Sequence, residues 1–372
     1  MKKIGRETLL LSCNENNSRN GEGAFLRLKD GKIVYAYTCY GGNGFDDHDT
    51  ANISAVYSSD EGETWSDAQV FFEKPKDALN VMSVSLLRMK NGDLGLFYLK
   101  KEVIDGEIVC MPIFHRSKDE GKTFDAGVCV TDTLGYYVLV NDRVLALKNG
   151  RIIMAIANHG KHLKSIASGI VEFYYSDDDG KTFNKSIDDV CSPFNDVHGL
   201  MEPGLLELKD GRVWLYARTD YGFQYQAFST DSGNTWSKAT PNYKFTSPSS
   251  PMLVRNIQDL TVAILNPMPQ STLFSRFDKW CNFKYMRTPF VMAVAKDGGL
   301  SFVEEDFSSQ KGEVLPFIEK CYYIEDDTTE SYCYPSIIEV EDGILVAYYF
   351  SNGSGQMLNS ARIKKISFNE LD

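Results

Sequence analysis

One short motif returns along the chain and limits what this sequence can fold into. It has the pattern S-x-D-x-G-x-T-W/F and occurs as SSDEGETW from Ser58, SKDEGKTF from Ser117, SDDDGKTF from Ser176, STDSGNTW from Ser229 and, in a weaker form, AKDGGLSF from Ala295. The steps between copies are 59, 59, 53 and 66 residues. A repeat of this length indicates a row of similar units, so the 372 residues do not have to divide into separate domains.

A second signal runs in phase with the first. Apolar segments flank a DG or NG turn whose glycines are Gly31, Gly92, Gly150, Gly211 and Gly343, and a degenerate turn at residues 256–259 fills the missing place. Such turns between apolar runs predict β-hairpins, because both turn positions need residues that tolerate positive φ. We expect an all-β, six-bladed β-propeller of four-stranded antiparallel blades, one domain over residues 1–372, with few helices.

The repeated box is expected where the third and fourth strands of a unit meet. Its Asp can bond the turn backbone, its Gly permits positive φ, and its final Trp or Phe can fill the space between sheets. We therefore interpret the box as a structural staple. A calcium loop is the alternative for SDDDG at residues 176–180, although the full spacing with a terminal Glu is missing. The last unit has no box, and the N-terminal ETLLLS is expected to complete its sheet and close the ring.

Composition restricts the partners. The net charge is -12 and no run of Lys or Arg appears, which argues against nucleic acid as a partner. The eight cysteines show no CxxC and no paired spacing, so we expect reduced, mostly buried thiols and neither a zinc site nor a disulfide framework. No motif for a metal or another cofactor is present.

The first residues resemble a leader peptide only briefly. LLSC is similar to a lipobox, but the apolar run covers only Leu9 to Leu11 and is too short for a signal peptide. The sequence also has no apolar stretch near 18 residues, so we expect a cytoplasmic protein without a membrane partner.

Polar residues recur at one place in each unit. Nine residues before the hairpin glycines stand Glu22, Ser83, Asn141, Glu202 and Tyr334. These positions begin the strands beside the central channel, at the end opposite the boxes. A ring of polar residues there predicts a central substrate pocket.

These residues carry a resemblance that spans essentially the whole chain. The boxes are similar to the Asp boxes of the sialidase (neuraminidase) superfamily. EPGLLELKDGRVWLYAR, from Glu202 to Arg218, resembles the segment with a catalytic Glu and an arginine of the carboxylate-binding triad. YPSIIEVEDGILVAYY, from Tyr334, resembles the segment that begins with the nucleophilic tyrosine, and RTPFVMAVAKDGG, from Arg287, resembles the strand that leads from another triad arginine into a late box.

The resemblance implies an exo-acting, retaining glycoside hydrolase that releases a terminal sialic acid or a related acidic sugar. Arg218 and Arg287 would bind the carboxylate of such a carbohydrate substrate. A carboxylate nucleophile would be repelled by this substrate, so the expected nucleophile is Tyr334, activated by Glu202.

The resemblance also implies a general acid on a loop before the first box. In GGNGFDDHDTANIS the candidates are Asp46, Asp47, His48 and Asp49; Asp47 or Asp49 is preferred, and His48 could tune or replace them.

The chain departs from the family at the third arginine. The family has an RIP motif, whereas Arg19 stands in NSRNGEG without Ile-Pro. Glu22 takes the ring position beside Arg19 and would repel a substrate carboxylate unless it pairs with an arginine or bonds a hydroxyl. A different sugar, acidic or neutral, therefore stays open.

Other interpretations stay open as well. Tyr334 could be an ordinary buried tyrosine, and Arg218 and Arg287 could be cross-strand ion-pair partners. His159 and His198 could line the pocket or be ordinary loop histidines. From other functional classes, a sugar-binding propeller without turnover and a structural scaffold are possible, because a fold does not determine a function.

Overall fold

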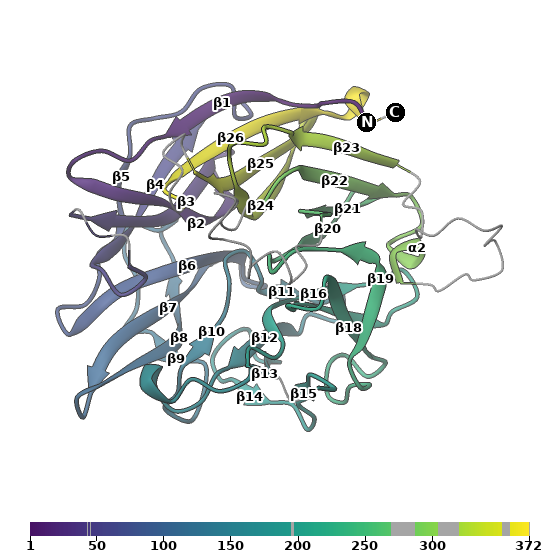
Figure 1. Ribbon diagram of the computed structural model, residues 1–372. Helices are drawn as coiled ribbons and strands as arrows, with labels where there is room; N and C mark the ends of the chain where they lie inside the picture. The colour runs from purple at the N-terminus through teal and green to yellow at the C-terminus, as the bar shows by residue number, and fades with distance from the viewer. Residues whose placement is uncertain are drawn as a thin grey trace, which may run out of the picture.

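The computed structural model describes residues 1–42, 44, 46–194, 197–268, 287–303, 320–351 and 358–371. Within these ranges most of the regular structure is β-strand, and the helical elements are η1 (Leu163–Ser165), α2 (Leu300–Val303) and η3 (Phe368–Glu370). The antiparallel sheets follow one another around a common centre (Figure 1). This arrangement confirms the expected all-β class and the β-propeller fold.

The strands group into sheets as follows. An eight-stranded sheet contains β2 (Asn17–Arg27), β3 (Ile33–Gly41), β4 (Ala51–Ser58), β5 (Gln69–Phe72), β6 (Ala78–Arg88), β7 (Leu94–Ile104), β8 (Glu107–Ser117) and β9 (Val128–Cys129). A six-stranded sheet contains β10 (Tyr137–Val138), β11 (Leu145–Ala146), β12 (Ile152–Asn158), β13 (Ile170–Ser176), β14 (Asn184–Lys185) and β15 (Val190–Cys191). One four-stranded sheet contains β16 (Met201–Glu207), β17 (Val213–Arg218), β18 (Phe223–Ser229) and β19 (Thr240–Thr246). A second four-stranded sheet contains β20 (Leu253–Ile257), β21 (Leu260–Leu265), β22 (Phe290–Ala295) and β23 (Lys320–Glu325). A last one contains β24 (Tyr332–Val340), β25 (Gly343–Phe350), β26 (Ser360–Ser367) and β1 (Arg6–Leu11).

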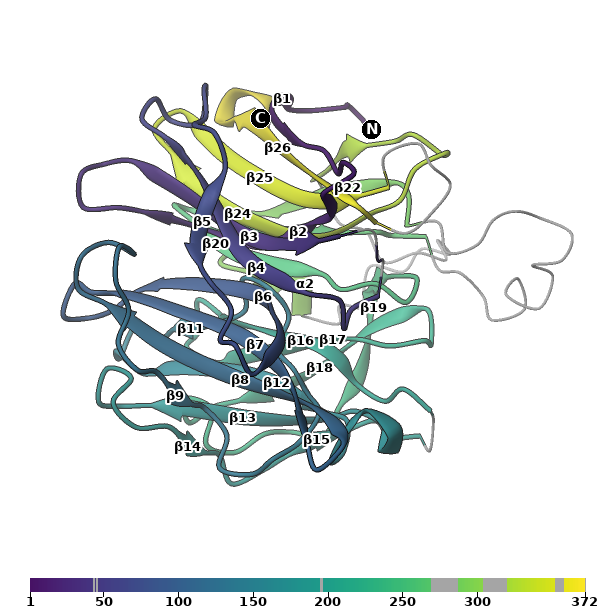
Figure 2. The ribbon, with the colours of Figure 1, turned by 90° about the vertical axis from the view of Figure 1, so that its left-hand side faces the viewer.

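The eight-stranded sheet consists of two groups of four strands. They are β2 to β5 and β6 to β9, and the parallel pair Ala51 and Asn80 connects them. Figure 2 shows the two groups at the front of the molecule. The predicted hairpins are confirmed: Gly31 lies between β2 and β3, Gly211 lies between β16 and β17, and residues 258–259 form the turn between β20 and β21.

The repeated box forms a turn after the third strand of its unit. In the first copy Ser58 Oγ donates to Asp60 Oδ1 at 2.8 Å and accepts from the backbone N–H of Gly62 at 2.9 Å. Asp60 accepts from the backbone N–H and the hydroxyl of Thr64 at 2.9 and 2.6 Å. The carboxylate therefore binds the turn backbone as the sequence predicted.

The same bonds recur in the copies from Ser117, Ser176 and Ser229. The carboxylate suggested as part of a calcium loop, Asp178, thus staples its own turn. At the aromatic end, Trp236 stacks on Phe173 of the preceding sheet with ring centroids 3.9 Å apart. The box is a structural staple.

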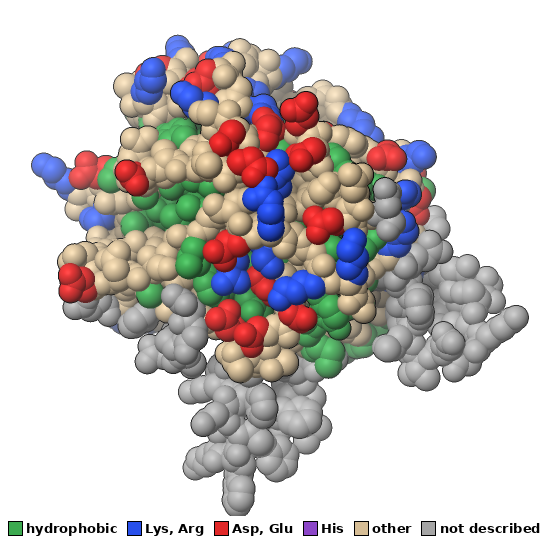
Figure 3. Space-filling view, turned by 90° about the horizontal axis from the view of Figure 1, so that it is seen from above, with side chains coloured by type: hydrophobic (Ala, Val, Ile, Leu, Met, Phe, Trp, Pro, Cys, Tyr) green, Lys and Arg blue, Asp and Glu red, His purple; other side chains and the backbone are tan. Residues whose placement is uncertain are grey.

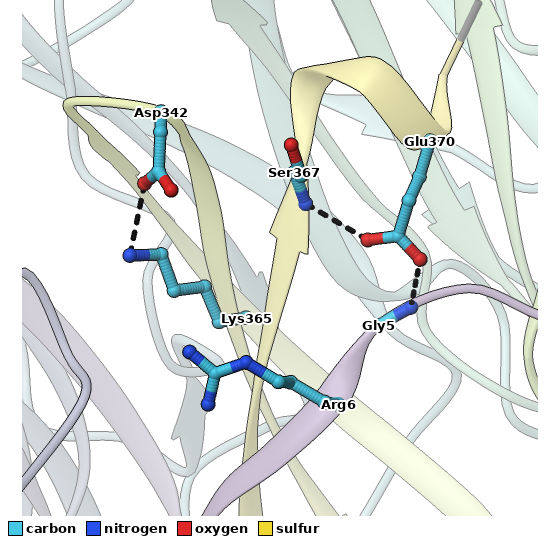
Figure 4. Close-up of a pocket in the computed structure, with 6 residues that line it drawn as sticks. All are labelled: Gly5, Arg6, Asp342, Lys365, Ser367 and Glu370. Carbon is cyan, nitrogen blue, oxygen red and sulfur yellow. Dashed lines mark hydrogen bonds and ion pairs between the residues drawn. The ribbon is translucent and has the colours of Figure 1, made fainter.

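The two ends of the chain share the last sheet. β1 pairs with β26, and Glu370 accepts from the backbone N–H groups of Ser367 at 2.9 Å and Gly5 at 3.0 Å (Figure 4). Lys365 pairs with Asp342 at 2.8 Å beside this contact. On this side of the molecule, basic and acidic side chains are interspersed (Figure 3). The expectation that the N-terminal segment completes the last sheet is confirmed.

The cysteines differ from the expectation. All seven in the described ranges are free thiols, of which Cys110 and Cys333 are buried while Cys129 and Cys191 are exposed. The prediction of mostly buried thiols is therefore wrong for this part of the chain, because Cys129 and Cys191 lie on the outer strands β9 and β15. Cys281 lies outside the described residues.

No helix in the described ranges has the length and apolar character that a membrane span requires.

Candidate functional site

Four of the five ring positions lie on β-bulges. Glu22, Ser83, Glu202 and Tyr334 have φ angles of 52°, 59°, 45° and 54°, in the left-handed region that non-glycine residues seldom adopt. Each strand shifts its pairing register around the same residue. A bulge redirects a side chain out of the strand alternation, and strained backbone of this kind gathers at functional sites. All four residues line one pocket.

The third unit departs from this register. Its left-handed residue is Asp142, with φ 55°, one position later than the ring predicts. Asn141 is fully buried, and its amide donates to the carbonyls of Gly23 at 2.8 Å and Tyr334 at 3.3 Å. Asn141 is not among the residues that line the pocket, and it ties the first strands of neighbouring units together instead.

The centre of the site is a tyrosine–carboxylate pair. The Tyr334 hydroxyl donates to Glu202 Oε1 at 2.7 Å, and Arg218 Nη1 donates to Glu202 Oε2 at 2.7 Å. The Glu202 side chain is 11% exposed and that of Arg218 is 17% exposed. β24 supplies Tyr334, whereas β16 and β17 supply Glu202 and Arg218, so the ring of sheets brings together residues far apart in sequence.

The surroundings determine the charge of this pair. Burial raises the pKa of Tyr334 well above its usual range, and the neighbouring Glu202 raises it further. Burial alone would raise the pKa of Glu202, but Arg218 and Arg287 outweigh burial and hold it below its ordinary value. At neutral pH the pair is therefore a carboxylate that accepts a hydrogen bond from a neutral phenol. A base beside a protonated nucleophile is the arrangement that covalent catalysis requires.

A second arginine lies beside the pair. The Arg287 guanidinium carbon is 5.6 Å from the centroid of the Tyr334 ring, and its Nη1 donates to Cys333 Sγ at 3.0 Å. Arg287 Nη2 donates to the carbonyl of Ser249 at 3.1 Å, and Arg218 Nε donates to the Ser249 hydroxyl at 3.0 Å. The two guanidinium groups predicted from the sequence therefore share Ser249 and form a local positive centre in an acidic protein.

Arg19 lies deeper, with a side chain that is 4% exposed. Its Nε donates to the Tyr349 hydroxyl at 2.6 Å, its Nη1 donates to Asp47 Oδ1 at 2.8 Å, and its guanidinium carbon is 4.4 Å from the centroid of the Tyr40 ring. The structure thus places Arg19 near the pocket, bound to a carboxylate of the protein itself.

Asp47 is the member of the 46–49 cluster that lines the pocket, and its side chain is 53% exposed. Desolvation would raise its pKa, but Arg19 and Lys101 together hold it below the ordinary value. Lys101 Nζ and Asn80 Nδ2 both donate to the carbonyl of Asp47 at 2.8 Å, which holds the loop against the pocket.

The other members of the cluster bond within the loop or to its neighbours. Asp49 Oδ2 accepts from the backbone N–H of Asp46 at 2.8 Å. His48 Nδ1 lies 2.5 Å from Asp46 Oδ1, and its Nε2 lies 3.3 Å from the hydroxyl of Tyr136, a residue of the pocket wall.

Glu22 is the third carboxyl group of the pocket, and it is buried. Its Oε2 accepts from the hydroxyl of Ser83. Burial raises the pKa of Glu22 to about 7, the charge of Asp47 adds to this effect, and the bond from Ser83 opposes it. Asp47 and Glu202 each pair with an arginine, whereas Glu22 forms no ion pair with any described residue.

Sequence reasoning missed the pocket residues Met82, Leu99, Lys101, Cys110, Tyr136, Val138 and Val140. Lys101 did leave a signal. Leu99 follows its ring residue by 16 positions, as Arg218 follows Glu202, and alternation along the strand puts Lys101 on the same face as Leu99. The pocket has a volume of about 130 Å³, smaller than the roughly 300 Å³ at which typical small-molecule pockets begin.

A chain of polar contacts leads from the surface to the pair. His198, whose side chain is 57% exposed, contacts Asp220 through Nδ1, and Asp220 Oδ1 accepts from the Ser249 hydroxyl. Ser249 in turn accepts from Arg218. His159 is different: it is buried, its Nδ1 lies 3.1 Å from a backbone carbonyl, and burial lowers its pKa.

Residues 46–347 match the BNR repeat-like domain family, and this range covers most of the chain. The chain belongs to this family. No curated protein matches the sequence of this BNR repeat-like protein. The matched range contains four complete boxes, the 46–49 cluster and all the residues that line the pocket except Glu22; Arg19 and Tyr40 also precede it, and Tyr349 follows it.

Solved structures with the same fold include known enzymes. A protein of unknown function from Dyadobacter fermentans has a TM-score of 0.71 and 17% identity over 97% of this chain and 98% of its own. The NanB sialidase from Streptococcus pneumoniae has a TM-score of 0.71 and 15% identity over 100% of this chain and 71% of its own. The intramolecular trans-sialidase from Ruminococcus gnavus has a TM-score of 0.67 and 15% identity over 95% of each chain. At these identities the BNR repeat-like protein shares their fold, a sialidase-like propeller.

Proposed function

We propose that the protein is an exo-acting, retaining glycoside hydrolase that releases a terminal sialic acid or a related acidic sugar from a glycoconjugate or oligosaccharide. The observation that carries this proposal is the 2.7 Å hydrogen bond between the Tyr334 hydroxyl and the buried Glu202 in the pocket, with Arg218 and Arg287 beside it. The resemblance of these segments to the sialidase superfamily supports it.

In this proposal Tyr334 is the nucleophile. Glu202 takes the phenol proton while the Tyr334 oxygen attacks the anomeric carbon, and water later releases the sugar from the covalent intermediate. Arg218 and Arg287 bind the carboxylate that the substrate carries at this carbon. A neutral phenol suits such a substrate because a carboxylate nucleophile would be repelled.

The leaving oxygen needs a proton from a pocket acid. Of the loop candidates Asp47 and Asp49, Asp47 lines the pocket. His48 contacts the hydroxyl of Tyr136, which lines the same pocket. Arg19 completes an arginine triad only if the carboxylate of the substrate replaces Asp47 as its partner.

One observation favours a second candidate, a glycosidase for a different terminal sugar. Arg19 and Arg218 already pair with carboxylates of the protein, at 2.8 and 2.7 Å, and Glu22 adds a further carboxyl group to the pocket. Such a pocket suits hydroxyl groups as well as a carboxylate. Sugar binding without turnover is the alternative from another class, and the Tyr334–Glu202 pair argues against it.

We also propose that the ring has six blades and that residues 1–372 form one domain. Six buried apolar clusters support this count, because each lies between neighbouring groups of strands, and the last joins β24 to β26 with β2 to β4.

The test measures release of fluorophore from a 4-methylumbelliferyl sialic acid glycoside by the wild type and by Tyr334→Phe. We expect at least a roughly thousandfold loss of kcat in the variant, because an activated nucleophile is removed. Tyr332→Phe is the matched control: it lies on the same strand, and its hydroxyl bonds Glu330 instead of the site.

If the folded wild type releases no fluorophore from the sialic acid glycoside, aryl glycosides of other sugars are assayed next. Turnover of one of them that depends on Tyr334 would support the second candidate. If the protein turns over none of these glycosides but binds a sugar, the result would contradict the proposed enzyme and support a sugar-binding protein.

A further inference from the structure

Among the described residues three carboxyl groups line the pocket, and their partners differ. Asp47 pairs with Arg19 at 2.8 Å and Glu202 pairs with Arg218 at 2.7 Å, so both are held as carboxylates. Glu22 has the Ser83 hydroxyl as its donor and forms no ion pair within the described ranges. A group that must give a proton to a substrate has to carry that proton at the working pH.

We propose that Glu22, held by Ser83, is the acid that protonates the leaving-group oxygen, and that Asp47 stays ionised as the partner of Arg19. This inference rests on the proposed glycosidase function and replaces the loop aspartates in one of its roles. The left-handed bulge at Glu22 supports it, because the same distortion presents Glu202 and Tyr334 to the pocket.

The reaction takes two steps. In the first, the Tyr334 oxygen bonds to the anomeric carbon, its proton passes to Glu202, the bond to the leaving oxygen breaks, and that oxygen takes the proton of Glu22. In the second, water attacks the anomeric carbon and gives a proton to the Glu22 carboxylate, while the Tyr334 oxygen leaves and recovers its proton from Glu202. The sum is hydrolysis of one glycosidic bond by one water molecule.

The groups that face Glu22 explain why it keeps its proton. Burial is the largest cause of its pKa of about 7, the carboxylates of Asp47 and Glu202 raise the pKa, and Ser83 and Arg19 lower it. The remaining titratable neighbours are Tyr35, Tyr40, Tyr349 and Cys110, and burial raises the pKa of each. Lys101, which lines the same pocket, donates to the carbonyl of Asp47. Two carboxyl groups whose surroundings separate their pKa values mark an acid and a base.

The leaving group distinguishes the acid from the other carboxylates. Whichever sugar the wild type accepts is supplied as a 4-methylumbelliferyl glycoside, which departs with little help, and as a methyl glycoside, which needs a proton. For Glu22→Gln we expect kcat/KM to fall roughly a hundredfold or more on the methyl glycoside and less than about tenfold on the aryl glycoside. For Asp47→Asn we expect equal losses on both substrates.

The opposite pattern would overturn the inference and leave the proposed function in place: selective loss on the methyl glycoside in Asp47→Asn, with equal losses in Glu22→Gln. Absence of turnover of any glycoside by the wild type would overturn both proposals. Loss of both activities in Tyr334→Phe, with the leaving-group pattern of Glu22→Gln as expected, would support both.

Ser83→Ala tests the same point without changing Glu22. The bond from Ser83 lowers the pKa of Glu22, so removing this bond raises that pKa. We therefore expect kcat/KM to begin its decline at a higher pH in Ser83→Ala than in the wild type. An unchanged pH profile in a folded Ser83→Ala protein, with circular dichroism like that of the wild type, would argue against Glu22 as the acid.

Discussion

Replacing Glu22 by Gln is expected to change how the stability of the protein depends on pH. The pKa of Glu22 rises from its ordinary value of 4.5 to about 7 on folding, and burial is the main cause. Between these two pH values the folded protein holds a proton that the unfolded chain has released, so the free energy of unfolding falls as pH rises. At 1.36 kcal/mol per pH unit this loss is about 3 kcal/mol, and it is complete above pH 7.

Glu22→Gln removes this contribution and keeps a side chain of similar shape that can accept the bond from Ser83. Relative to that of the wild type, the free energy of unfolding of the variant is expected to rise by about 3 kcal/mol between pH 4 and pH 8. Urea unfolding followed by tryptophan fluorescence at intervals across this range measures the difference.

Asp47→Asn is the matched control, because its pKa is lowered on folding by Arg19 and Lys101 against the effect of desolvation. Asp47 therefore stabilises the fold above its ordinary pKa of 3.8, and the control variant is expected to lose stability relative to the wild type as pH rises through that value. If the curves of Glu22→Gln and the wild type run parallel from pH 4 to pH 8, Glu22 is ionised in the folded protein and the reasoning is refuted.

Three further changes test parts of the site and the fold. Asp220→Asn weakens the hydrogen bond from Ser249, which in turn orients Arg218, and roughly 1.5 kcal/mol of stability should be lost in urea unfolding, since a hydrogen bond to a charged group is worth about that much. Asn80→Ala removes donors that hold two carbonyls of the loop at residues 46–49 at 2.8 and 2.9 Å, and roughly 1–3 kcal/mol of stability should be lost in urea unfolding. Gly204→Ala places a Cβ 2.4 Å from a tyrosine ring, so the same measurement should show a loss of roughly 1–3 kcal/mol; no change would mean that the ring moves freely.

The pocket shows where sequence reasoning reached its limit. Counting back from the hairpin glycines located Glu22, Ser83, Glu202 and Tyr334, because a hairpin sets the register of the strand before it. The same count chose Asn141, but the residue with positive φ in that unit is the next one, Asp142, and the Asn141 side chain is buried among backbone carbonyls. A shift of one residue turns a side chain to the other face, and nothing in the local sequence announces it.

Most residues of the pocket wall could not be predicted from the sequence either. Tyr136, Val138 and Val140 come from a segment of short, irregular strands with no repeat signal, and they reach the pocket through the packing of one sheet against the next. Lys101 was readable only by comparing its strand with the one that carries Arg218.

The sequence by itself determined the repeat, the hairpins, the stapled turns and the closing strand, because each depends on residues near one another in the chain or on a regular period. Tertiary structure alone decided which charges meet. The ion pairs of Arg19 with Asp47 and of Arg218 with Glu202, and the bond from Ser83 to Glu22, follow from distances across the ring of sheets. The protonation of each carboxyl group depends on burial and on those neighbours, so the chemistry of the pocket becomes defined only when the ring has closed.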